Sequence, residues 1–293
     1  MDSKARVRNV CALVAVTALA GLLMLAAIAS GGERLKTKSQ TTQIDPQDDG
    51  SATAKCKRGT KAVSGGFSSE LDLANPALIL PYASLRQGGR GWRSSGLYLS
   101  GAQESDFTSY AYCRDEQLKK NSKSVTVDGS APPDYGTGSA TAKCPKGTTI
   151  VSGGFDNPDF DVDFSGMGQT GLIGYESRRQ GKRKWTASAL NLGDDSGELR
   201  VQANCREGEK LKTKQRSEEI DATGGAELAE VTARCAKKQR VISGGFSSSD
   251  PIDAGGSELA LVYGSRKQGK RQWTVSAVLT GEETITAYAY CEA

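Results

Sequence analysis

The 293-residue chain contains no histidine. This absence excludes Ser-His-Asp and Cys-His nucleophiles, histidine-ligated zinc and imidazole pH switches. Methionine and tryptophan are scarce, with three of each, whereas 35 residues are glycine. The formal net charge is only +4, and a general nucleic-acid binder would usually be far more basic. The many glycine, threonine, serine and valine residues favour strands and turns over helices.

Near the N-terminus, residues 10–29 form a run without a charge, and the basic stretch Arg6-Val7-Arg8 precedes it. The triplet Ala27-Ile28-Ala29 fits the small-x-small rule for cleavage of a secretory signal peptide. A run of this length also just spans a bilayer, so an uncleaved signal anchor at residues 1–29 is the alternative. We favour cleavage. Both interpretations place the rest of the chain outside the cytoplasm, in the extracellular space or at the cell surface.

Three segments of the chain repeat the same landmarks, and we place them at residues 33–114, 115–206 and 207–293. Each has a basic stretch, a β-branched residue followed by aspartate, a cysteine, the motif (V/I)SGGF, a tyrosine, a tryptophan ten residues later and a second cysteine. The stretches from cysteine to SGGF are Cys56–Phe67, Cys144–Phe155 and Cys235–Phe246, and the tryptophans are Trp92, Trp185 and Trp273.

Six cysteines remain when Cys11, inside the hydrophobic run, is set aside. The context of Cys11 lacks the small residues of a lipoprotein cleavage site, so we expect no lipid anchor. An even number of cysteines on an exported chain indicates disulfides. Six cysteines allow many connectivities, but pairing within each repeat forms the same bond three times, at about 4 kcal/mol each in the chain-entropy model. The predicted pairs are Cys56–Cys113, Cys144–Cys205 and Cys235–Cys291.

Alternating side chains place each cysteine on a strand face with small residues, as with Ala52, Ala54 and Cys56. Small side chains let two strands approach to disulfide distance. The paired glycines of SGGF indicate a bulge or a place where another backbone lies close. We expect the following phenylalanine in the core. We interpret the tryptophan as buried and structural, with ligand stacking as the alternative.

About six strand candidates per repeat suffice for a small sandwich. We therefore predict an all-β protein of three tandem antiparallel β units, each with one internal disulfide, preceded by an N-terminal hydrophobic helix. The units form either separate sandwiches or one closed, pseudo-threefold body. A trefoil has shorter repeats, and the tryptophans stand too far after the first cysteine for an immunoglobulin domain.

The motifs C-P-x-G-x5-S-G-G-F, W-T-(V/A)-S-A and A-Y-A-Y-C resemble a repeat of exported, mostly uncharacterised bacterial proteins, actinobacterial ones among them. The resemblance covers all three repeats. It implies export and a β-rich fold, and it implies no activity. The third repeat departs at Lys238, where the pattern has glycine.

The stretch between tyrosine and tryptophan is strongly basic in two repeats: SRRQGKRKW, residues 177–185, and SRKQGKRQW, residues 265–273. A hairpin turning at Gln-Gly would place Arg179 opposite Lys182, and Lys267 opposite Lys270. Like charges in such positions weaken a ladder unless an anionic partner compensates. The alternative is a solvated tip. The candidate ligands for an anionic polymer are Arg178, Arg179, Lys182, Arg183, Lys184, Arg266, Lys267, Lys270 and Arg271.

The sequence contains two acidic sets that are candidates for a site or for turns. Asp159, Asp161 and Asp163 alternate as calcium ligands often do, but Phe164 and Thr170 do not fit an EF-hand. The alternative for residues 156–164 is an amphipathic strand with its phenylalanines inward. The second set, Asp45, Asp128 and Asp221, is predicted to begin turns. No pair of carboxylates stands out for glycoside hydrolysis.

These patterns favour a non-enzymatic exported protein without a cofactor that binds a cell-wall glycopolymer or another extracellular polyanion, and not a specific nucleic acid. The first alternative is a disulfide-stabilised spacer or coat without a specific ligand. The second is a secreted carbohydrate-active enzyme. The sequence leaves the oligomeric state open. Salt-sensitive binding would separate the first two hypotheses, and turnover would mark the third.

Overall fold

The structure is a computed structural model that describes residues 35–71, 77–130, 135–161, 170–208, 210–248 and 259–293. The hydrophobic segment 10–29, and with it the predicted N-terminal helix, lies outside the described residues. Within the described ranges no helix is long and apolar enough to cross a membrane. Residues 35–293 group together as one unit.

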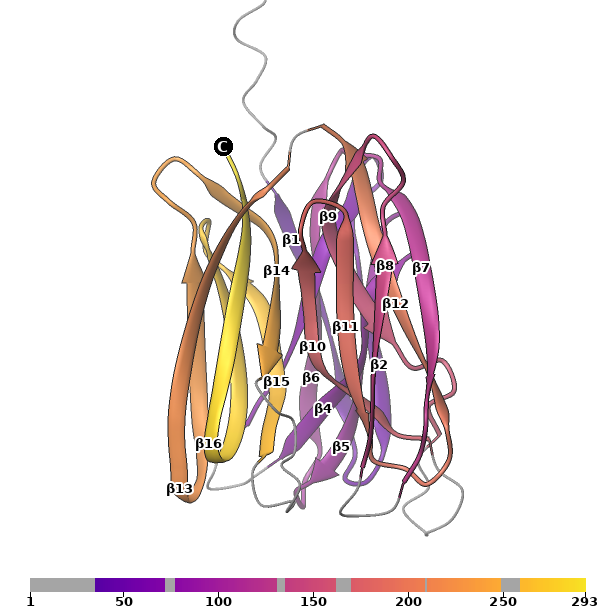
Figure 1. Cartoon of the computed structure of the whole chain (residues 1–293), viewed down its shortest axis with the longest axis vertical. Helices are drawn as coiled ribbons and strands as arrows, with labels where there is room; N and C mark the ends of the chain where they lie inside the picture. Colours follow the sequence, from indigo (N-terminus) through magenta and orange to yellow (C-terminus); the bar gives the residue numbers. More distant parts are fainter. Residues whose placement is uncertain (1–34, 72–76, 131–134, 162–169, 209, 249–258) are drawn as a thin grey trace, which may run out of the picture. The chain divides into compact units, whose positions relative to one another are not determined.

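The predicted all-β class is confirmed, because the described residues form sixteen strands joined in antiparallel pairs (Figure 1). The first repeat contains β1 (Lys36–Ile44), β2 (Asp49–Lys55), β3 (Lys61–Ser69), β4 (Leu78–Gln87), β5 (Gly91–Ser100) and β6 (Ser105–Arg114). The second contains β7 (Lys119–Val127), β8 (Gly136–Lys143), β9 (Thr148–Asp156), β10 (Leu172–Gln180), β11 (Lys184–Asn191) and β12 (Gly197–Glu207). The third contains β13 (Lys212–Arg234), β14 (Arg240–Ser248), β15 (Leu259–Gln268) and β16 (Gln272–Glu292).

Each repeat builds two small groups of strands that face one another. In the first repeat these are β1-β6-β3 and β2-β5-β4, and in the second β7-β12-β9 and β8-β11-β10. In the third, the long strands β13 and β16 pair twice, on both sides of a register shift between Ala222 and Glu227. Asp221 therefore lies within β13, so the prediction that it begins a turn is wrong. Asp45 does begin a turn, since its carbonyl accepts the N–H of Asp48.

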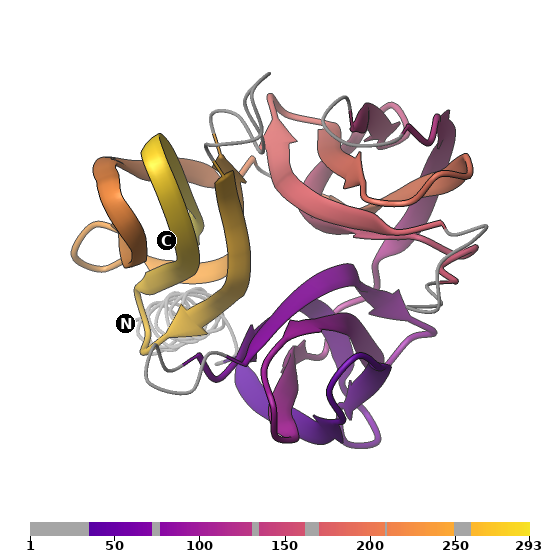
Figure 2. The ribbon, with the colours of Figure 1, turned by 90° about the horizontal axis from the view of Figure 1, so that it is seen from below.

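Strand pairing continues from repeat to repeat through three junctions. Strand β4 pairs with β9 at the first junction, β10 with β14 at the second, and β15 with β3 at the third. The third junction returns to the first repeat, so the pairings form a cycle. Figure 2 shows the strands of the repeats as three groups around a common centre.

Three buried serines close the same cycle. Ser64 donates to the carbonyl of Ile242, Ser152 to that of Val63, and Ser243 to that of Val151. Each acceptor is a residue skipped in the strand register, so its carbonyl is turned out of its own ladder toward the neighbouring repeat. The predicted bulge therefore exists, but it precedes the glycine pair instead of lying on it.

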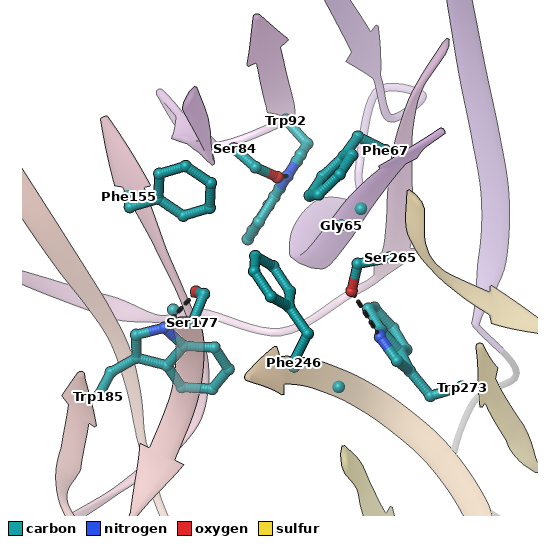
Figure 3. Close-up of a pocket in the computed structure, with 14 residues that line it drawn as sticks. Gly65, Phe67, Ser84, Trp92, Phe155, Ser177, Trp185, Phe246, Ser265 and Trp273 are labelled. Atoms are coloured by element: carbon teal, nitrogen blue, oxygen red, sulfur yellow. Dashed lines mark hydrogen bonds between the residues drawn. The ribbon is translucent and has the colours of Figure 1, made fainter. Parts of the chain in front are cut away.

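The paired glycines are positions of close approach. A Cβ on Gly153 would overlap the indole of Trp185, and one on Gly154 would overlap the carbonyl oxygen of Ser84 in the first repeat. The tryptophan is 1% exposed, and its indole N–H donates to Ser177 at 3.0 Å. The same arrangement recurs at the other two tryptophans, and phenylalanines from the three repeats meet beside them (Figure 3).

The cavity between these aromatic side chains measures about 20 Å³, which is room for roughly one water molecule. A ligand does not fit there. The three tryptophans are therefore structural, as the sequence predicts.

The three predicted disulfides are confirmed. Cys56–Cys113, Cys144–Cys205 and Cys235–Cys291 join strands whose Cα atoms are 5.7, 5.7 and 5.8 Å apart. The small residues beside them are buried, Ala54 to 1% exposed and Ala111 to 0%. Bulkier side chains on these faces would hold the two layers too far apart for the bond.

We expect Gly153→Ala to lower the free energy of unfolding of the full chain by about 2 to 3 kcal/mol, because the new methyl group overpacks against a rigid indole. Urea denaturation with the disulfides intact measures the change. Gly89→Ala is the matched control, since its Cβ would meet only the flexible side chain of Lys61 at 3.6 Å. Equal losses in the two variants would contradict the close-approach argument.

Lys238 has a φ of 69°, where Gly59 and Gly147 at the matching positions have φ of 82°. A left-handed backbone costs a residue with a Cβ roughly 1 to 2 kcal/mol. Glycine avoids this cost, but it loses more conformational entropy on folding, which offsets part of the gain. Lys238→Gly should therefore stabilise the chain by about 0.5 to 1 kcal/mol in thermal or urea unfolding. Lys237→Gly removes the same charge at an ordinary φ and should destabilise it. A stabilisation by both variants would point to charge instead of backbone strain.

Candidate anion-binding surface

Lysine and arginine residues gather at the end of residues 35–293 that carries the three disulfides. The register places Lys36 opposite Cys113 and Lys55 opposite Gly91, so the starts of the outer strands and the tips of the β4–β5 type hairpins lie at this end. We call it the basic end. No lysine or arginine occurs in residues 39–54, 62–85, 94–113, 124–142, 149–177, 185–199, 217–233, 241–265 and 272–293.

The opposite end, which we call the acidic end, carries the turns between the other strands. Its described acidic residues include Asp45, Asp48, Glu104, Asp128, Asp194, Asp195 and Glu282. The small net charge of the whole chain thus conceals two ends of opposite sign. A field of this kind attracts anions to one end and repels them from the other.

Ion pairs link the three repeats beside the disulfides. Arg114 bonds Glu116 and, at 2.6 Å, Glu292, while Arg206 bonds the same two carboxylates at 3.1 and 3.5 Å. Burial lowers the pKa of Arg114, but the two glutamates more than offset this and raise it overall. These cations are neutralised within the structure, so the free positive charge lies around them on the hairpin tips and loops.

Backbone hydrogen bonds fix the hairpin tips. Cys144 N–H donates to the carbonyl of Arg183 at 2.7 Å, and Ile150 N–H to that of Lys182 at 3.1 Å. The other repeats form the same bonds, at Arg90 and Gly89 in the first and at Arg271 and Lys270 in the third. The backbone of the basic tips is thus held against the disulfide-bonded loops.

The expected hairpin register is wrong. Gln180 pairs with Lys184 and Arg179 with Trp185, which leaves Gly181, Lys182 and Arg183 as the loop. In the third repeat Lys267 pairs with Trp273. The glycine at each loop start has positive φ, 66° at Gly181 and 62° at Gly269, which begins the turn one residue later than a Gln-Gly turn would. The expected pairs of like charges within these hairpins therefore do not form. Lys184 instead lies opposite Lys143 of the neighbouring strand β8.

The structure divides the candidate ligands into two groups. Arg179 is only 6% exposed, and its guanidinium donates to the carbonyl of Leu211 at 2.7 Å and to Thr213. Arg178 bonds Glu176 and lies over the ring of Tyr288. Lys267 lies over Tyr112, and Arg266 is half-buried. Burial lowers the pKa of both Arg179 and Lys267. Arg178, Arg179 and Lys267 thus contact residues of neighbouring segments of the chain.

The second group remains accessible. Lys182, Lys184 and Lys270 are exposed, and Arg183 and Arg271 are half-buried. The tip at residues 180–184 and Lys143 of β8 line a shallow depression of about 540 Å³ that contains four cations and no carboxylate. The loops of the basic end carry further exposed basic residues: Lys57, Arg58, Arg90, Lys146, Lys237 and Lys238.

The calcium candidates receive no support from the described residues. Asp159 and Asp161 are exposed, Asp163 lies outside the described ranges, and no cluster of three potential ligands occurs within those ranges. The alternative, an amphipathic strand over residues 156–164, does not form at residues 157–160, Asp161 makes only an isolated bridge to Thr170, and residues 162–164 lie outside the described ranges. Strand β9 ends at Asp156, and Phe160 stacks on Tyr82 with ring centroids 3.7 Å apart.

No family model matches the chain, and no curated protein sequence matches it at a significant level. The resemblance to an exported bacterial repeat therefore remains a prediction.

The separation of charge between the two ends was not predicted from the sequence, because only the net charge of the chain was considered. The signal was present in the order of residues. After residue 35, lysine and arginine are absent from long stretches of uncharged and acidic residues, and these stretches form the middle and far end of each hairpin. Counting charge along each predicted strand from its cysteine would have shown it.

Arg179→Ala should lower the free energy of unfolding by about 2 to 3 kcal/mol, because it removes charge-assisted hydrogen bonds and leaves the Leu211 carbonyl unpaired. Lys182→Ala, three residues away on the exposed loop, should change it by less than about 0.5 kcal/mol. Urea unfolding of both variants tests whether the basic stretch contains the two groups. A neutral Arg179→Ala would return that residue to the ligand set.

Proposed function

We propose that this chain is an exported, non-enzymatic β-repeat protein that binds an extracellular anionic polymer, such as a cell-wall glycopolymer, through its basic end. The observation that carries the proposal is the accessible set of cations on backbone-anchored hairpin tips, separated from the acidic end. Because the backbone of the tips is already ordered, binding there costs little backbone conformational freedom.

Three features support export and a single body. The three disulfides are compatible with an oxidising environment outside the cytoplasm. The cyclic strand pairing and the cyclic serine bonds favour one closed pseudo-threefold arrangement of the repeats over independent beads. A body of this kind would present all its basic tips together to one long ligand.

The second candidate function is a disulfide-stabilised spacer or coat without a specific ligand. The dense hydrogen bonding between repeats favours it, since a closed β body with covalent crosslinks resists unfolding and proteolysis. It predicts no saturable binding.

The test measures binding of the full chain, with its disulfides formed, to purified cell-wall polymer fractions and to polyphosphate. If about four charge contacts form, affinity should fall on the order of 10²-fold between about 50 and 200 mM salt. Lys182→Ser/Arg183→Ser/Lys184→Ser should reduce the slope of log affinity against log salt by about two to three.

Asp194→Ser/Asp195→Ser, at the acidic end, is the matched control and should leave that slope unchanged. Absence of binding to every polyanion at low salt would reject the proposed function and leave the spacer or coat hypothesis. Binding that the basic-tip variant does not weaken would reject the basic end as the site.

A further inference from the structure

The second and third junctions are filled by tyrosines. At the second, the N–H of Arg179 donates to the hydroxyl of Tyr290 at 2.7 Å, and its guanidinium carbon lies 4.6 Å from the ring centroid. Tyr288 stands beside it and bonds Ser247. At the third, the N–H of Lys267 donates to Tyr112 in the same way, also at 2.7 Å. Burial raises the pKa of both Tyr112 and Tyr290, so these side chains are uncharged where they fill the space between repeats.

The first junction replaces these residues at the matching positions. Aligned on the second cysteine of each repeat, Asn204 stands where Tyr112 and Tyr290 stand, and Gln202 where Tyr110 and Tyr288 stand. Aligned on SGGF, Asp156 takes the place of Ser68 and Ser247. Arg93, Arg200 and Lys120 occupy positions that are threonine at the other junctions: Thr186 and Thr274, Thr108 and Thr286, and Thr37 and Thr213.

A groove of about 480 Å³ lies at this junction. Amide side chains are shorter than tyrosine, so they leave space that the rings fill elsewhere. Its volume falls in the range of small-molecule sites. The residues that line it are Leu85, Arg86, Gln87, Gly88, Arg93, Lys120, Ser122, Asp156, Arg200 and Gln202.

The groove carries four cations against a single carboxylate. Asp156 is 0% exposed, and its two oxygens bond one guanidinium nitrogen each, from Arg93 and Arg200. The arginine side chains remain 29% and 40% exposed. A guanidinium has five N–H donors, so the aspartate orients both groups and leaves donors directed to other partners.

Buried polar atoms at this junction lack partners among the described residues. They are Nε of Arg86 and Oε1 of Gln202, both in residues that line the groove, and Oδ1 of Asn204 behind it. These residues are 6%, 2% and 0% exposed. An unsatisfied buried polar atom costs about 1 to 3 kcal/mol, and a ligand with donors and acceptors would remove that cost.

We propose that the groove at the first junction binds one oxyanion-bearing polyol, a sugar-sized unit with a phosphate or carboxylate group beside hydroxyls. Arg93, Arg200 and Lys120 bind the oxyanion, and Oε1 of Gln202 accepts a hydrogen bond from a hydroxyl group. The lining residues include no aromatic side chain, which disfavours a nucleotide base or another flat ring. This inference rests on the proposed function and names the part of the polymer that the chain recognises.

Calorimetric titration of the full chain, with its disulfides formed, uses three probes: glycerol 3-phosphate, glucuronate and inorganic phosphate. We expect one site per chain for at least one of the two polyols. Binding of glycerol 3-phosphate alone assigns the phosphate source, and binding of glucuronate alone assigns the carboxylate. Inorganic phosphate should bind at least several-fold more weakly than glycerol 3-phosphate, and equal affinity would overturn the polyol part.

The decisive variant copies the second junction: Arg93→Thr/Asp156→Ser/Arg200→Thr/Gln202→Tyr/Asn204→Tyr. It should lose at least ten-fold in affinity. Lys120→Thr changes one exposed side chain, so the chain should still fold, and it should weaken binding several-fold even if the larger variant fails to fold. The control is Lys182→Ser/Arg183→Ser/Lys184→Ser, which should retain the small-anion site. Lack of binding by the wild type, or unchanged affinity in Lys120→Thr and in a folded five-residue variant, would overturn the proposal.

The two proposals fail separately. Polymer binding without any small-anion binding would reject the groove and keep the basic end. Small-anion binding without polymer binding would keep the groove and reject the proposed function.

Discussion

The contact between a glycine pair and a neighbouring repeat is the constraint on which the rest of the structure depends. The second glycine of each pair lies against a backbone carbonyl of another repeat, and the first lies under its own tryptophan. A Cβ at either position would separate these layers. Because the serine just before each pair bonds the preceding repeat of the cycle, one four-residue motif positions both the indole and the junction strand.

This constraint explains why the region around the three tryptophans is tightly packed and why the accessible charged residues lie elsewhere. The residues around the tryptophans are in close contact, and the cavity among them admits about one water. Residues at the outer edge of each junction carry no such restriction. Tyrosines fill that edge twice, whereas Gln202 and Asn204 leave it open once, and charged residues occupy the resulting space. The first junction therefore carries a groove, although its strands pair as those of the other junctions do.

The accessible charged residues are also separate from the residues that hold the scaffold together. The disulfide end holds loops and hairpin tips that are tied to the scaffold by backbone bonds, so their side chains are free to point into solvent. In the proposed function, cations on these tips would add long-range attraction for polyanions, and the oriented guanidinium groups of the groove would select a particular unit. The acidic turns at the opposite end would then oppose binding there.

The sequence by itself determined the strands, the buried tryptophans and the pairing of cysteines, because these depend on alternation and on a pattern written three times. It also contained the charge separation, which is set by the distance of each cation from its cysteine along a strand. Only the tertiary structure decided which basic residues are accessible and where the groove opens. Arg179 is buried by Tyr290, which lies 111 residues away, and the first junction joins Asp156 to Arg93 across 63 residues. Local periodicity carries no information about such partners, because they meet only when the cycle of junctions closes.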